Sequence, residues 1–222
     1  MRRLFHKIAA AAVFLAAVGG AGGQEPATQP CTSPTARAVV EGAVAEALAV
    51  LASRELPAAE RTARVFEIAD RHIDYETIAR LVLGTFWQQA TVQQQAEFVR
   101  EFRRHIQGVY AQTIDDHEDE QVVVTEDRQE PRGDWTVRAI IFSNVKADGK
   151  RKEIGRLAFR MRLIGRQWKA IDVTVEGISV LVLYRAQFQA VAAAGGMERV
   201  LQVLRARNAP LDRSAGGADA AR

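Results

Sequence analysis

The sequence predicts an α+β fold, in which a helical lobe packs on one face of a four-stranded antiparallel sheet. Two changes of periodicity lead to this prediction. Apolar residues recur every three or four positions as far as residue 114, every two positions between residues 121 and 175, and helically again from residue 179. Consecutive strands with short turns form an antiparallel meander, and amphipathic helices bury their stripes against the apolar face of such a sheet.

The first 23 residues have the pattern of a removable secretory signal peptide. A basic start with Arg2, Arg3 and Lys7 precedes an apolar stretch over residues 8–18 and the small residues of 19–23. As a helix the apolar stretch would extend about 16 Å, whereas a bilayer core is about 30 Å thick. We therefore expect cleavage near Gly23 and export; the alternative is an uncleaved membrane anchor.

The net charge of +3 belongs to this signal peptide. The whole chain has 30 Lys and Arg residues against 27 Asp and Glu residues, and residues 1–23 hold three of the cations and no acid. The mature chain therefore has 27 of each and no net charge. A nucleic-acid-binding protein would be expected to carry a clustered basic surface, so we expect no nucleic-acid partner.

Residues 24–34 contain three prolines and small polar residues, which predicts a flexible leader. The single cysteine, Cys31, lies in this leader, so no intramolecular disulfide can form. Attachment of a lipid to Cys31 is an alternative, but Thr28-Gln29-Pro30 is not the apolar and small run that lipidation needs.

The folded domain is expected over residues 35–207 and begins with helices. The spacing predicts helices at 35–51, before Pro57, and at 59–70. A third helix follows from a capping Asp74 to Gly84, which suits a C-cap. Thr91 and Gln94 form a potential capping box before a long amphipathic helix that extends to Ile114. The acidic run 115–120 is expected to be a loop.

Alternation of apolar and polar residues predicts strands at 121–126, 134–146, 151–164 and 167–175, with an Asp148-Gly149 hairpin turn. Leu157, Phe159 and Met161 alternate with arginines, so one face of the sheet should be covered by helices and the other exposed to solvent. Glu176-Gly177 should end the sheet. Helices are expected at 179–193 and 197–207, interrupted by Gly195-Gly196, and residues 208–222 should form a disordered tail.

No motif for catalysis or metal binding is present. The segment around Ser179 lacks the second glycine of a Gly-x-Ser-x-Gly elbow, and no His-Glu-x-x-His or phosphate-binding glycine loop occurs. The histidines are scattered, and His72 close to Asp74 is explained as a helix end beside an acidic cap. We therefore expect a protein without catalytic residues, metal or cofactor. The large apolar side chains could fill a core or line a cavity, and periodicity does not separate the two.

Two blocks of sequence resemble the MlaC family. The first is Ile73-Asp74-Tyr75-Glu76-Thr77-Ile78-Ala79-Arg80-Leu81-Val82-Leu83-Gly84, followed by Gln94-Gln95-Ala96-Glu97-Phe98 and Phe102. The second and more specific block is Trp168-Lys169-Ala170-Ile171-Asp172-Val173-Thr174-Val175-Glu176-Gly177-Ile178-Ser179-Val180, followed by Tyr184-Arg185-Ala186-Gln187-Phe188. The resemblance extends from about residue 35 to residue 207.

The resemblance implies a fold with an apolar cavity between helices and sheet, and a soluble lipid carrier of the periplasm. Such a carrier sequesters the acyl chains of a phospholipid and shuttles the lipid between an inner-membrane ABC transporter and an outer-membrane lipoprotein–porin complex, which supports outer-membrane lipid asymmetry. We expect a monomer. The alternatives are a carrier of a hopanoid or other terpenoid lipid, and an enzyme that uses Asp172 or His72 as a base beside an apolar pocket.

On this basis the side chains expected to face both layers should line the acyl-chain site. Asp172 and Glu176 are expected to be structural, as an acid pair at the strand end, and Arg185 to fix the junction with the following helix. Contact of Arg185 with a lipid phosphate at the mouth is the alternative. The expected lipid-binding residues are Tyr75, Ile78, Leu81, Phe102, Ile106, Tyr110, Ile141, Leu157, Phe159, Met161, Val173, Val175, Leu181, Tyr184 and Phe188.

Overall fold

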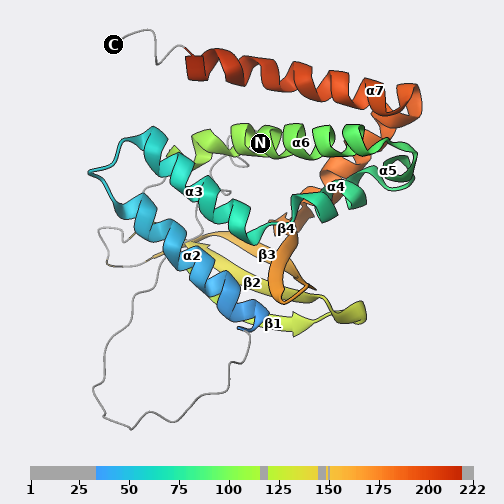
Figure 1. The fold of residues 1–222 in the computed structure, drawn as a ribbon. Coiled ribbons are helices and arrows are strands. Elements are labelled where there is room, and N and C mark those ends of the chain that lie inside the picture. The colour runs from blue at the N-terminus through green and yellow to red at the C-terminus, as the bar shows by residue number, and fades with distance from the viewer. Residues whose placement is uncertain (1–33, 116–119, 145–148, 150, 217–222) are drawn as a thin grey trace.

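The computed structural model describes residues 34–115, 120–144, 149 and 151–216. The expected signal peptide, nearly all of the expected leader with Cys31, the middle of the acidic run and the last six residues lie outside the described residues. The elements keep the labels of Figure 1. The helices are α2 (Ala36–Ala52), α3 (Ala58–His72), α4 (Tyr75–Leu83), α5 (Thr85–Gln89), α6 (Val92–Asp115) and α7 (Val180–Gly216).

The strands form one antiparallel sheet in the order β1-β2-β3-β4-β5. Their bounds are β1 (Gln121–Gln129), β2 (Trp135–Phe142), β3 (Glu153–Ile164), β4 (Gln167–Val175) and β5 (Ile178–Ser179), with a short 3₁₀ turn η1 at Pro131–Gly133 between β1 and β2. The α+β class is confirmed. The described residues form five strands rather than four, because the turn at Glu176 and Gly177, both at positive φ, returns the chain to pair with β4.

Helices α4 and α6 begin at the capping residues that the sequence predicts. The Asp74 carboxylate accepts hydrogen bonds from the backbone N–H groups of Glu76 and Thr77, at 3.1 Å each, and caps α4. At α6 the capping box is reciprocal: Gln94 N donates to Thr91 Oγ1 at 3.2 Å, and Thr91 N donates to Gln94 Oε1 at 3.0 Å.

The largest buried cluster lies among the helices. Figure 1 shows the layers, from the sheet through α3 and α4 to α6 and the outer half of α7. Phe98 and Phe102 of α6 meet Tyr184 and Phe188 of α7, with ring centroids 5.2 to 6.0 Å apart and mostly edge-to-face. Such pairs contribute about 1 kcal/mol each beyond the area that they bury, so this cluster stiffens the helical layer.

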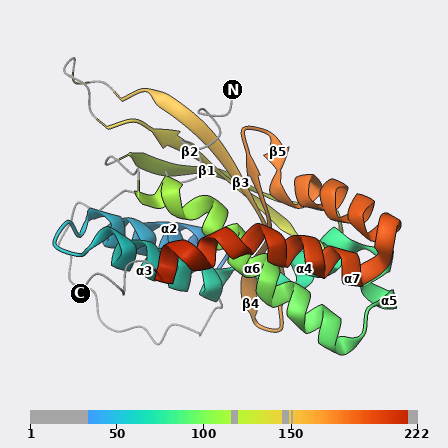
Figure 2. The same ribbon diagram turned by 90° about the horizontal axis from the view of Figure 1, so that it is seen from above.

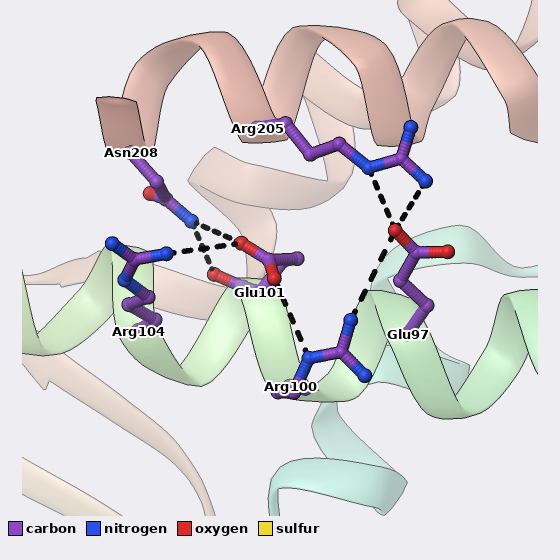
Figure 3. Close-up of polar contacts among 6 residues, drawn as sticks. All are labelled: Glu97, Arg100, Glu101, Arg104, Arg205 and Asn208. Carbon is purple, nitrogen blue, oxygen red and sulfur yellow. Dashed lines mark hydrogen bonds and ion pairs between the residues drawn. The ribbon is translucent and has the colours of Figure 1, made fainter. Parts of the chain in front are cut away.

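Helix α7 consists of two halves that meet at Gly195 and Gly196, where the backbone leaves helical geometry. The second half, residues 197–216, runs back along α6 and is joined to it by a polar network (Figure 3). Arg205 pairs with Glu97 across the two helices, and Asn208 Nδ2 donates to the carbonyl oxygen of Glu101 at 2.9 Å.

The disordered tail was predicted to begin at residue 208, which is too early in the chain. Asn208 is only 1% exposed and bonds to α6, and the helix continues to Gly216, so residues 208–216 are helical. His105 of α6 lies beside this part of α7. It is half-buried, with its ring 5.6 Å from that of Tyr184, and burial together with nearby Arg207 lowers its pKa.

The uncovered face of the sheet carries the arginines that alternate along β3. Arg160 and Arg162 both bond to Asp134, whose side chain is 2% exposed; Arg162 Nε lies 2.7 Å from Asp134 Oδ1 and Arg160 Nε 2.9 Å from Asp134 Oδ2. The Arg162 hydrogen bonds hold the pKa of this carboxyl below its usual value, despite partial desolvation.

Candidate functional site

An apolar cavity of about 240 Å³ lies between the helical layer and the inner face of the sheet. Its walls come from α2, α3, α4, α6, β3, β4 and the start of α7. They consist of Ala47, Leu51, Val65, Phe66, Ala69, Ile73, Tyr75, Ile78, Phe102, Ile106, Tyr110, Ile114, Leu157, Phe159, Ala170, Asp172, Val173, Val175, Val180 and Leu181.

The spacing of these residues follows from the geometry of each element. On α6 the lining residues Phe102, Ile106, Tyr110 and Ile114 are each four positions apart, so they form one stripe along the helix. On the sheet, Leu157 and Phe159 of β3 stand opposite Val175 and Val173 of β4. Residues directly opposite in adjacent strands project to the same face, so the four side chains form one patch of the cavity floor.

A second apolar cavity, of about 170 Å³, adjoins the first. It lies between α2, α3 and the inner face of β3 and β4, with Val40, Ala43, Ile68 and Met161 among its walls. Both cavities are lined by Ala47, Val65, Ala69, Ile73, Phe159, Ala170 and Val173, which therefore form the boundary between them.

Ten of the fifteen expected lipid-site residues lie in the wall of the first cavity, and Met161 lines the second. The ten are Tyr75, Ile78, Phe102, Ile106, Tyr110, Leu157, Phe159, Val173, Val175 and Leu181.

The other four expected residues line neither cavity. Leu81 follows Tyr75 by six positions, which turns it about 120° around the helix axis from the cavity side. Ile141 is fully buried in a sheet cluster beneath Val44 of α2. Tyr184 and Phe188 belong to the aromatic cluster among the helices.

Sequence reasoning missed the contribution of α2 and α3 to the site. Ala47 and Leu51 of α2, and Val65, Phe66 and Ala69 of α3, line the first cavity. The helical spacing of these residues was visible in the sequence. It indicates an apolar face, but not which neighbouring layer that face meets.

Few polar groups reach the first cavity. Among the described residues of its walls, Asp172 is the only charged one, and its carboxylate is already bonded: Ser179 Oγ donates to Oδ2 at 2.6 Å and Leu181 N donates to Oδ1 at 3.0 Å. The carboxylate thus holds the start of α7, as the structural interpretation expects. Burial raises the pKa of the Tyr75 and Tyr110 phenols, so both are uncharged near neutral pH.

Glu176 makes the structural contacts expected at the junction between β4 and α7, whereas Arg185 does not. Glu176 bonds to the Arg156 backbone: its own N–H donates to the Arg156 carbonyl at 3.0 Å, and its carboxylate accepts from Arg156 N. It therefore ties the end of β4 to β3. Arg185 was expected to fix the junction, but it is exposed and makes no ion pair or hydrogen bond with the described residues. It lies one helical turn beyond Leu181, and its contact with a headgroup stays a prediction.

The second cavity contains one titratable side chain, His72 at the end of α3. Burial lowers the pKa of His72, and nearby Lys169 and Arg71 lower it further. Within the described part of the chain, no three His, Cys, Asp or Glu side chains gather closely enough to hold a metal ion. None of the described helices has the length and apolar composition needed to cross a membrane.

Comparisons with known proteins identify a family and a solved structure. The family model described as "MlaC protein" matches residues 41–206. A phospholipid-binding protein from Ralstonia solanacearum, solved in complex with a phospholipid, is 25% identical in sequence and superposes with a TM-score of 0.69. The match covers 81% of this chain and 99% of that one. No curated protein matches the sequence.

Proposed function

This chain belongs to the MlaC protein family, and we propose that it is a lipid carrier that encloses the acyl chains of a phospholipid between its helices and its sheet. The apolar cavity with walls from both layers is the observation that carries the proposal. The similar Ralstonia solanacearum protein binds a phospholipid, which supports this class of ligand.

The chemistry of the walls suits acyl chains. Burying each CH₂ group contributes roughly 0.8 kcal/mol, so a typical chain is worth on the order of ten kcal/mol when it leaves water. Recovering this free energy requires apolar contact around the chain, and the cavity has apolar walls from both layers. A polar headgroup can stay in water at the mouth, so no buried cation is needed to balance its charge.

The two adjoining cavities suit a lipid with two chains. The boundary residues Ala47 and Ala69 are small, and they stand between cavities of about 240 and 170 Å³. We infer that each cavity receives one chain, with the glycerol backbone near their shared boundary.

We further propose that the protein works in the periplasm, after export through its signal peptide, and passes lipid between an inner-membrane ABC transporter and an outer-membrane lipoprotein–porin complex. The basic, apolar and small-residue order of residues 1–23 supports export. The apolar cavity supports transfer through water, since acyl chains would have to be shielded along the way.

Bound lipid can be identified in protein purified from cells without detergent, by extraction and mass spectrometry. We expect phospholipid with two chains in about equal molar amount to the protein. Recovery of a hopanoid or another terpenoid would change the ligand, and lipid-free protein that takes up nothing from vesicles would overturn the proposal.

A variant and a matched control make this experiment specific to the cavity. Ala47→Phe places a ring at the boundary of the two cavities, whereas Ala49→Phe makes the same change at an exposed position of the same helix. We expect Ala47→Phe to lose bound phospholipid by about tenfold or more, equivalent to about 1.4 kcal/mol. Ala49→Phe should keep it. Equal lipid content in both variants would mean that the lipid does not occupy the boundary between the two cavities.

A further inference from the structure

The first half of α7, residues 180–194, exposes apolar side chains on its outward face. Val182 is 61% exposed and Leu183 is 47% exposed, and Ile178, four residues before Val182, is 44% exposed. Ala186 and Ala190 continue the same face and are also exposed. Figure 2 shows this half of α7 along one edge of the molecule, next to β5. We call Ile178, Val182, Leu183, Ala186 and Ala190 the α7 patch.

The only charge along the first half of α7 is positive. Arg185 is the only charged residue between residues 177 and 197, and it has no acidic partner among the described residues. Several other helical arginines form ion pairs, as Arg103 of α6 does with Asp70, and as Arg205 in the second half of α7 does with Glu97. The patch therefore combines exposed apolar groups with one uncompensated cation.

The α7 patch adjoins the cavity. Val180 and Leu181, in the same helical turn as Val182, belong to the cavity wall. This turn is held firmly, because Asp172 accepts from Leu181 N, and Ser179 Oγ in turn accepts from Val182 N at 3.0 Å. A surface that rests on the patch would therefore lie beside the wall of the cavity.

We propose that the α7 patch docks on the surface of an anionic phospholipid bilayer, so that lipid can pass between bilayer and cavity without crossing open water. The apolar side chains would enter the boundary between headgroups and acyl chains, and Arg185 would meet a headgroup phosphate. The single cation on this half of α7 favours an anionic surface, and the position of the patch beside the cavity favours lipid over protein. The inference rests on the proposed function.

The test measures co-flotation of the full mature protein with vesicles that contain no other protein. One set of vesicles contains phosphatidylethanolamine and phosphatidylglycerol, and the other contains phosphatidylcholine alone. The double variant Val182→Asp, Leu183→Asp is compared with Val92→Asp, because Val92 is 82% exposed at the start of α6, away from the cavity walls. Arg185→Gln is compared with Arg166→Gln, an exposed cation in the turn between β3 and β4.

We expect the wild type to float with the anionic vesicles, and the double variant to lose this by about tenfold or more while Val92→Asp keeps it. Arg185→Gln should weaken binding to anionic vesicles about fivefold, equivalent to about 1 kcal/mol for one cation near such a surface. Binding to phosphatidylcholine should be weak and unaffected by Arg185→Gln, and Arg166→Gln should bind as the wild type does.

Three results would overturn the proposal: no flotation of the wild type, equal flotation of the double variant, or association only with a purified membrane protein complex. Arg185→Gln changes an exposed, unpartnered side chain, so it tests the patch even if the double variant folds poorly. Lipid extracted from the same preparations separates the two claims. Lipid-loaded protein that does not bind vesicles refutes the docking surface and leaves the proposed carrier intact. Lipid-free protein that floats with vesicles but takes up no lipid refutes the carrier and leaves the docking surface intact.

Discussion

A second carboxylate in the cavity wall, without hydrogen-bond partners of its own, should weaken lipid binding by up to about a thousandfold at neutral pH without preventing folding. Val173 lies on β4 opposite Phe159, and both residues form part of the boundary of the two cavities. In Val173→Asp the new carboxylate can be hydrated while the cavity is empty. An acyl chain would strip that water away. Neither cavity has a Lys or Arg among its described walls to pair with the charge, and burial lowers the pKa of His72, which disfavours a positive charge on it at pH 7.

The size of the effect follows from the cost of neutralising the carboxylate. An ordinary Asp pKa of about 3.9 means that protonation at pH 7 costs about 4 kcal/mol, at 1.36 kcal/mol per pH unit. Because protonation relieves the desolvation penalty, this cost is the ceiling on the loss of binding free energy. It corresponds to about a thousandfold weaker binding at pH 7.

The affinity of Val173→Asp for lipid should depend on pH in one direction. Lipid raises the pKa of the new carboxyl above its value in the free protein, so the protonated form binds better. Affinity should therefore rise about tenfold per pH unit as pH falls from about 7, and level off near pH 4. Binding of a fluorescent phospholipid, titrated at several pH values, measures this directly.

The matched control is Val173→Thr, which has nearly the same size and no charge. It should bind within about tenfold of the wild type, with no such pH dependence. If Val173→Asp bound lipid as tightly as Val173→Thr at pH 7, acyl chains would not occupy this part of the cavity, and the reasoning would fail. Thermal unfolding of both variants checks that the fold is retained.

Three further predictions concern stability and are checked by denaturant unfolding. Asp134→Asn should cost about 3 kcal/mol, because Arg160 and Arg162 lose the buried charge that they share. Since the pKa of Asp134 is lowered, its stabilisation exists above the unfolded-state pKa of about 3.9 and disappears as pH falls through the folded value; the variant should lack this acid-dependent step. Thr91→Ala should lower the free energy of unfolding by about 1 kcal/mol through loss of the capping box. An unchanged free energy of unfolding would mean that Thr91 does not stabilise the start of α6. Phe188→Ala should cost about 3 to 5 kcal/mol, because its ring is fully buried among aromatic neighbours; a loss below 1 kcal/mol would mean that the cluster is loosely packed.

Local signals in the sequence were sufficient where one short segment decides the structure. The Thr91 box, the Asp74 cap and the break at Gly195-Gly196 all occur at the expected positions, because each depends on hydrogen bonds or φ values within a few residues. Strand β4 was predicted to the residue, since turns at both ends bound its alternating pattern.

Predictions that depend on distant contacts were less complete. Tyr184 and Phe188 have the helical spacing of cavity residues, but they pack on Phe98 and Phe102 instead. Periodicity shows that a face is buried and leaves its partner undetermined. The same reason explains why the walls from α2 and α3 were missed, although their apolar stripes were recognised. Strand β5 is too short for alternation to reveal it.

The reversal of α7 at Gly195 and Gly196 has a consequence for the order of folding. It brings Arg205 to Glu97 and Asn208 to Glu101, contacts that join residues 108 and 107 positions apart. Closing such long loops costs entropy that is recovered only when the contacts form, which slows folding. The helical core also needs Leu201 and Leu204, so it cannot be completed until almost the whole chain has been synthesised. The proposed export of the chain before it folds would benefit from this delay, because the second half of α7 supplies the contacts that close the native structure.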